Sequence, residues 1–91
     1  MNWTVIWLDD AEDQLAATYL FALKDDRAAE CTSASERVEA LLRTAPKTAG
    51  ESRGRRGRML FEKPMAVTFE VHEPEEVAVV LSVRYVIPRR R

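Results

Sequence analysis

The sequence has 91 residues, the size of one small domain, and it is 46% hydrophobic and 32% charged, as in folded globular proteins. One cysteine and one histidine exclude an internal disulfide and make a zinc site improbable, so we expect no metal and no other cofactor. The only long apolar run, Val77–Val83, is too short to span a membrane, and the N-terminus has no secretion signal. We therefore expect a cytoplasmic protein that does not act at a membrane.

Charge is distributed unevenly along the chain. Residues 1–50 contain nine Asp or Glu against five Lys or Arg, a net charge of −4. Residues 51–91 contain six against nine, a net charge of +3, and the two halves together give the overall −1. A basic C-terminal half can present a positive surface to an anion, although a solvated charge asymmetry without a ligand is the alternative.

The predicted elements begin with a strand and two helices. Trp3–Leu8 is rich in β-branched and aromatic residues and predicts a strand. A helix over 9–24 follows, capped by Asp9 or Asp10, because apolar residues recur there at helical spacing. A second helix over 25–45 begins at another aspartate pair and ends before a proline. We expect these two helices to be adjacent and antiparallel.

Three strands are predicted in the second half. The glycine-rich stretch 47–57 predicts a mobile loop. Arg58–Glu62 and Ala66–His72 alternate between apolar and polar residues, which is typical of half-buried strands. Val77–Ile87 is almost entirely apolar and predicts a central strand. The predicted order is β-α-α-β-β-β, in one domain that spans 1–91.

Alternation within the strands predicts which side chains face the helices. The residues expected to face them are Met59, Phe61, Val67, Phe69, Val71, Val79, Leu81, Val83 and Tyr85. Leu60 and Val80 are expected on the opposite, open face. The polar and charged residues expected on that open face are Arg56, Arg58, Thr68, Glu70, His72, Ser82 and Arg84. This cluster is the candidate functional site.

Several segments, through their order and spacing, carry a resemblance to a known family: Trp3–Leu8, Ala11–Leu15, Gly50–Arg53, Arg58–Glu62, Pro64–Val71 and Ser82–Tyr85. Together they resemble the RelE/ParE superfamily, the toxins of type II toxin–antitoxin pairs. The resemblance covers almost the whole chain. It implies an α+β fold in which two N-terminal helices pack on a mostly antiparallel, twisted, four-stranded sheet.

The resemblance also implies a function. RelE-like members are metal-independent endoribonucleases that enter the ribosomal A site and cut messenger RNA, whereas ParE-like members inhibit DNA gyrase. Both are silenced by a cognate antitoxin that wraps the toxin. The expected partners are therefore an antitoxin and either the ribosome with its mRNA or DNA gyrase. RNA cleavage is the leading interpretation, gyrase inhibition is the second, and an inactive antitoxin-binding module is the third.

The resemblance suggests roles for individual residues. Arg56 and Arg58 fall where RelE-like members have lysines on the second strand of the family. Arg84 and Tyr85 resemble an Arg-Tyr pair near the end of YoeB-like members. Ala66 falls where many of these nucleases have an arginine, and an alanine cannot hold a phosphate. Because of this departure, an inactive antitoxin-binding module remains an alternative interpretation.

Cleavage of RNA without a metal requires charge stabilisation and proton transfer. Arginines suit the first task because a guanidinium can hold two phosphate oxygens, and a carboxylate or imidazole can move protons. The candidate catalytic residues are Arg56, Arg58, Glu70, Arg84 and Tyr85. The candidate RNA-binding residues are Arg53, Arg55 and His72. In the alternative interpretation, Arg84 and Glu70 form a cross-strand ion pair and His72 is an exposed residue at a strand end.

Overall fold

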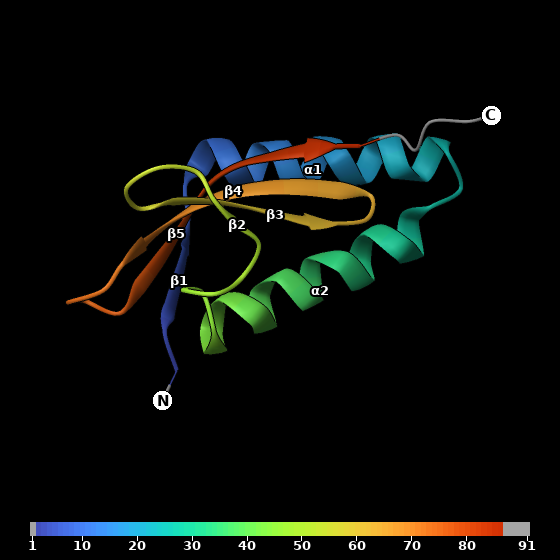
Figure 1. Ribbon diagram of the computed structural model, residues 1–91. Coiled ribbons are helices and arrows are strands. Elements are labelled where there is room, and N and C mark those ends of the chain that lie inside the picture. Colours follow the sequence, from blue (N-terminus) through green and yellow to red (C-terminus); the bar gives the residue numbers. More distant parts are fainter. Residues whose placement is uncertain (1, 87–91) are drawn as a thin grey trace.

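The computed structural model describes residues 2–86. Within them the elements are, in chain order, β1 (Thr4–Trp7), α1 (Asp9–Lys24), α2 (Ala28–Thr44), β2 (Glu51–Ser52), β3 (Gly57–Glu62), β4 (Met65–His72) and β5 (Val77–Tyr85). The strands form one sheet in the order β1-β5-β4-β3-β2. β1 is parallel to β5, and the other neighbouring strands are antiparallel (Figure 1).

The predicted α+β class and mostly antiparallel sheet are confirmed, but the sheet has five strands instead of four. The additional strand, β2, lies within the expected glycine-rich loop and pairs with Met59 and Arg58 of β3. The chain reverses between β2 and β3 in a tight loop, closed by a 2.7 Å hydrogen bond from Arg53 N to Gly57 O. Part of the predicted loop therefore extends the sheet.

Two strand ends differ from the sequence prediction. β1 is shorter than the predicted Trp3–Leu8, since the amide of Trp3 donates instead to Arg43 O at the end of α2. β5 ends at Tyr85, and Ile87, the predicted last residue of that strand, lies outside the described residues.

The two helices run antiparallel (Figure 1), but the aspartates do not cap them as predicted. Leu8 is the N-cap of α1, and Asp9 lies within the first turn, where a carboxylate interacts favourably with the helix dipole. Asp25 ends α1, Asp26 has a φ of 62°, and Arg27 is the N-cap of α2. The aspartate pair therefore forms the turn between the helices, because aspartate tolerates the left-handed conformation.

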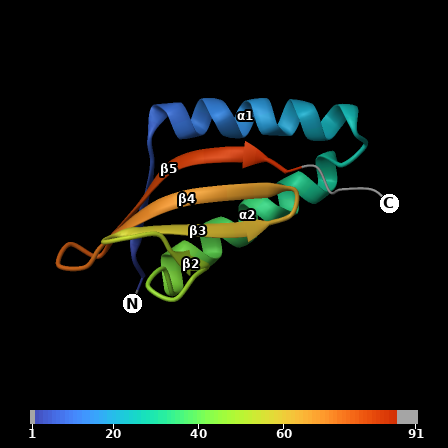
Figure 2. The same ribbon diagram turned by 45° about the horizontal axis from the view of Figure 1, so that its top comes forward.

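Both helices contribute to a single hydrophobic core on one face of the sheet. Figure 2 shows β3, β4 and β5 in front, α2 behind them and α1 along the β5 side. The buried residues of this core are Ala11, Ala22, Cys31, Ala34, Val38, Leu42, Ala49, Leu60, Met65, Val67, Phe69, Ala78, Val80 and Val83. Within residues 2–86 the opposite face of the sheet carries no helix (Figure 2), as expected.

The predicted orientation of β3 is wrong. Leu60 is 6% exposed and pairs with the buried Val67, whereas Phe61 is 59% exposed. Residues 59–61 are all apolar, so the sequence gives no clear alternation there, and pairing with β4 decides which side chain is buried. Leu60 consequently faces the helices, and so does Arg58, which is two residues away on the same strand. Phe61 lies on the open face.

A β-bulge changes the alternation of β5. The register with β4 shifts beside Phe69, which pairs with Val80, so that Leu81 is the extra residue. Before the bulge, Ala78 and Val80 are fully buried, and after it Val83 faces the core as predicted. The predicted orientations before the bulge are therefore wrong by one position, because an inserted residue reverses a two-residue period.

Candidate functional site

The open face brings together three predicted site residues, Arg56, Glu70 and His72. Glu70 and His72 are two residues apart on β4 and so point to the same side. Arg56 directly precedes Gly57, which pairs with Glu70. His72 Nε2 is 3.0 Å from Glu70 Oε1, and His72 Nδ1 is 3.3 Å from Arg56 Nη1. We call these three residues the histidine cluster.

The contacts of the histidine cluster define the tautomer of His72. A guanidinium has only N–H donors, so Nδ1 of His72 must accept the hydrogen bond from Arg56. Nε2 therefore carries the imidazole proton and donates it to the carboxylate of Glu70. The cluster thus combines an imidazole, a carboxylate that orients it and a guanidinium, which are groups used in proton transfer and in the binding of anions.

Arg84 is on the open face as predicted, but at the other end of it. It pairs with Ala66, which is four residues from Glu70 along β4, a separation of about 13 Å at the usual rise of a strand. The alternative ion pair between Arg84 and Glu70 is absent from the described residues, and Glu70 instead contacts His72. Arg84 and the histidine cluster are therefore too far apart to bind the same phosphate.

Arg58 lies on the helix side of the sheet, contrary to the prediction. Its Nε donates to Ala49 O at 2.7 Å, and its Nη2 donates to Gly50 O at 3.1 Å. These bonds attach β3 to the segment that follows α2. The guanidinium of Arg58 consequently has a structural role and points away from the histidine cluster.

We expect Arg58→Met to lower the free energy of unfolding by about 2 kcal/mol, because it removes two charge-assisted hydrogen bonds while keeping an apolar stem. Urea unfolding of the wild type and the variant measures the difference. Arg43→Met is the matched control, since Arg43 forms an exposed ion pair with Glu39 on α2. Equal losses from the two variants would contradict the structural role of Arg58.

Tyr85 also faces the helices. Its hydroxyl donates to Asp25 Oδ2 at 2.6 Å, and its ring stacks on Phe21 with centroids 5.9 Å apart. The hydrogen bond to Asp25 raises the pKa of Tyr85 above its usual value. Tyr85 thus connects the end of β5 to the end of α1, and its phenol lies on the face opposite to the histidine cluster.

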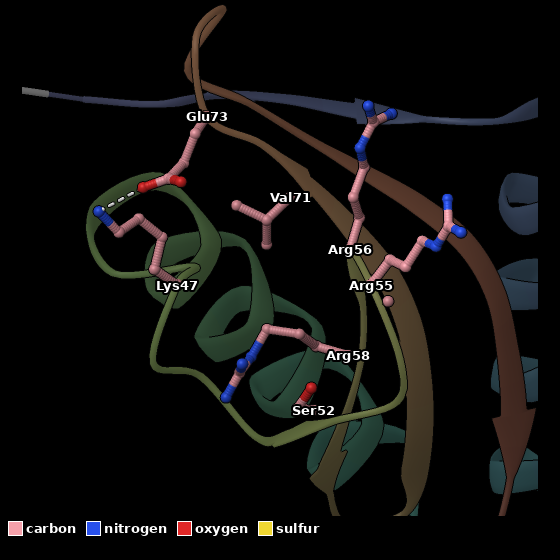
Figure 3. Close-up of a pocket in the computed structure, with 8 residues that line it drawn as sticks. Lys47, Ser52, Arg55, Arg56, Arg58, Val71 and Glu73 are labelled. Atoms are coloured by element: carbon pink, nitrogen blue, oxygen red, sulfur yellow. Dashed lines mark ion pairs between the residues drawn. The ribbon is translucent and has the colours of Figure 1, made fainter.

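A basic hollow of about 310 Å³ (Figure 3) shares Arg56 with the histidine cluster, but two of its other lining residues, Arg58 and Val71, face the helix side of the sheet. It is lined by Lys47, Ser52, Arg55, Arg56, Gly57, Arg58, Val71 and Glu73. In Figure 3 the side chains of Arg55 and Arg56 extend in the opposite direction to that of Arg58. Arg53, the other predicted RNA-binding arginine, is not part of the lining and pairs with Glu51 at 3.2 Å.

Lys47 is a residue of the hollow that sequence reasoning missed. Its Nζ is 2.7 Å from Glu73 Oε2, and this hydrogen bond raises the pKa of Lys47. The two residues are far apart in the sequence and no motif connects them, so only the fold brings them together. Four cationic side chains and one carboxylate line the hollow, but Lys47 is paired with Glu73 and Arg58 with the carbonyls of Ala49 and Gly50.

Two kinds of feature are absent from residues 2–86. No group of three or more His, Cys, Asp or Glu side chains there is arranged to hold a metal ion. None of the helices in this part of the chain has the length and apolar character needed to cross a membrane.

No protein-family model matches the sequence, and no curated protein is similar to it. The fold, however, is shared with solved structures. A chain of the chromosomal ParDE TA system from P. aeruginosa has a TM-score of 0.69 and 22% identity, over 93% of this chain and 97% of that one. A chain of the toxin–antitoxin complex RelBE2 from Mycobacterium tuberculosis has a TM-score of 0.63 and 14% identity, over 93% and 99%. At 22% and 14% identity the similarity establishes the fold and not the activity.

Proposed function

We propose that this chain, which has the fold of chains in the ParDE and RelBE2 systems, is the toxin of a bacterial toxin–antitoxin pair. We further propose that it is a metal-independent endoribonuclease that cuts messenger RNA on the ribosome. The observation that carries the proposal is the imidazole of His72, held between Glu70 and Arg56 on the open face. An oriented base beside a phosphate-binding cation is what RNA cleavage without a metal requires.

The proposed reaction begins when Arg56 leaves His72 and binds the scissile phosphate. Nδ1 of His72 then accepts the proton of the 2′-hydroxyl, while Glu70 keeps the ring in place through Nε2 and stabilises the imidazolium that forms. The 2′-oxygen attacks phosphorus, the bond to the 5′-oxygen breaks and this oxygen takes a proton from water, so the products are a 2′,3′-cyclic phosphate and a 5′-hydroxyl. Arg55, which extends in the same direction as Arg56 (Figure 3), binds the neighbouring backbone, which requires no particular base sequence.

An antitoxin is the proposed protein partner. The two similar structures come from toxin–antitoxin systems, and the C-terminal half of α1 exposes large apolar side chains that a partner could cover. These side chains are Tyr19, Leu20, Phe21 and Leu23, each at least 40% exposed. Exposure of such an apolar surface to water is unfavourable in free energy. This supports the proposal that the protein works as part of a complex.

Inhibition of DNA gyrase is the second candidate. It is favoured by the higher identity to the ParDE chain, 22% against 14% for the RelBE2 chain. In this function the basic hollow and the histidine cluster would contact gyrase or its DNA without performing chemistry.

The test is to induce the protein alone and to map messenger RNA ends by primer extension. New ends within translated codons, absent when translation initiation is blocked, are the expected result. Intact messages together with growth arrest and altered DNA supercoiling would replace the nuclease proposal with gyrase inhibition. Intact messages with normal growth would leave an inactive antitoxin-binding module.

A further inference from the structure

One large aromatic side chain of the sheet projects into solvent. Phe61 on β3 is 59% exposed on the open face, on the same side of the sheet as the histidine cluster. Across the sheet, Phe61 pairs with Ala66, and Ala66 pairs with Arg84. These three residues form a row across β3, β4 and β5. The exposed ring of Phe61 lies at one end of the row, the exposed guanidinium of Arg84 lies at the other, and only the methyl group of Ala66 lies between them.

We infer that Phe61 and Arg84 form a second nucleotide subsite, in which a base of single-stranded RNA stacks on Phe61 and an adjacent phosphate binds Arg84. This inference rests on the proposed function and names a part of the RNA surface outside the histidine cluster. Aromatic side chains stack on any base, so the subsite positions the strand without reading its sequence.

The distance between the two subsites suits a short strand. Phe61 and Gly57 are four residues apart on β3, about 13 Å, and Gly57 pairs with Glu70 of the histidine cluster. Stacked nucleotides advance about 3.4 Å along one strand, so a strand of a few nucleotides reaches from one subsite to the other. A base held at Phe61 would fix which phosphate lies at His72.

The charges on the open face favour RNA over an acidic peptide or an apolar partner. Among the described residues, Arg84 and Arg56 form no ion pair, and the carboxylate of Glu70 contacts His72. Glu62, beside Phe61 in the sequence, turns to the helix side and pairs with Arg37 at 2.8 Å. The ring of Phe61 is therefore flanked on its own face by a cation without a neighbouring carboxylate to neutralise it, which matches a base next to a phosphate.

The test measures binding of a 2′-O-methyl hexaribonucleotide by fluorescence anisotropy, because this probe lacks the hydroxyl needed for cleavage. We expect Phe61→Ala to raise the Kd about tenfold, which corresponds to about 1.4 kcal/mol, and Phe61→Tyr to retain binding. Leu8→Ala is the matched control, since Leu8 is also exposed, at 43%, but lies at the N-cap of α1, and it should leave the Kd unchanged. With a probe that carries abasic sites throughout, Phe61→Ala should have no further effect.

Several outcomes would overturn the inference. They are a wild-type protein that does not bind the probe, equal losses for Phe61→Ala and Leu8→Ala, and a Phe61→Ala variant that loses only antitoxin binding. Binding that depends on Phe61, combined with uncut messages in cells, would instead sustain the subsite and refute the nuclease proposal. Failure of the inference and failure of the proposed function are thus separate results.

Discussion

Replacing His72 by alanine is expected to lower the rate of ribosome-dependent RNA cleavage by about 10²- to 10⁴-fold, the usual contribution of a general base. The imidazole is the group whose Nδ1 faces Arg56 and whose Nε2 is bound by Glu70, so it is the base that this geometry presents to the 2′-hydroxyl. Single-turnover cleavage of messenger RNA on programmed ribosomes measures the rate. The stability of the variant should be close to that of the wild type, because His72 lies at the end of β4 and is partly exposed.

Glu75→Ala is the control for this experiment. Glu75 is exposed in the turn after β4, close to His72 in the sequence, and is not part of the histidine cluster. Glu70→Ala should give a smaller loss than His72→Ala, because it frees the ring to turn without removing the base, and added imidazole should partly restore His72→Ala only. A His72→Ala variant that cuts at the wild-type rate would refute the assignment of the base.

Gly50→Ala is expected to have the largest effect on stability, a loss of about 3 kcal/mol or more in the free energy of unfolding. Gly50 has a φ of +64°, a conformation that costs other residues about 1–2 kcal/mol. An added Cβ would also lie 2.0 Å from the carbonyl oxygen of Met59, so the backbone of β3 would have to shift. The same shift would disturb the hydrogen bond from Arg58 to Gly50 O.

Gly54→Ala separates the two causes. Gly54 also has a positive φ, +101°, but a Cβ there would meet no atom within 4 Å, so its alanine variant bears the conformational strain alone. Chemical denaturation of both variants should therefore show a loss for Gly50→Ala at least about twice that for Gly54→Ala. Similar losses would mean that the close approach of the loop to β3 contributes little.

Local patterns in the sequence were sufficient wherever an element has a clear period. The alternation of residues 66–72 correctly predicted that Val67 and Phe69 are buried and that Glu70 and His72 share the open face. The helical spacing of apolar residues correctly predicted a helix that ends at Lys24. These features depend on neighbours within a few residues, which a sequence displays directly.

The sequence was insufficient where a side chain is oriented by a distant partner. Arg58 and Tyr85 have no local feature that distinguishes a phosphate ligand from a structural donor, and the acceptors they contact belong to other elements. The bulge at Leu81 is equally invisible in the run Val77–Val83, because every face of an apolar strand looks the same before it is paired.

By itself, then, the sequence determined the α+β class, the order of the two helices and of every strand except β2, and the position of Glu70 and His72 on one side of β4. The tertiary structure alone decided that Arg56 completes this pair, that Arg84 lies about 13 Å along the open face with Phe61, and that Arg58 belongs to the opposite face. The physical reason is that hydrophobic periodicity is a local property of the chain. Strand register and the contacts of long side chains are set by residues far away in sequence.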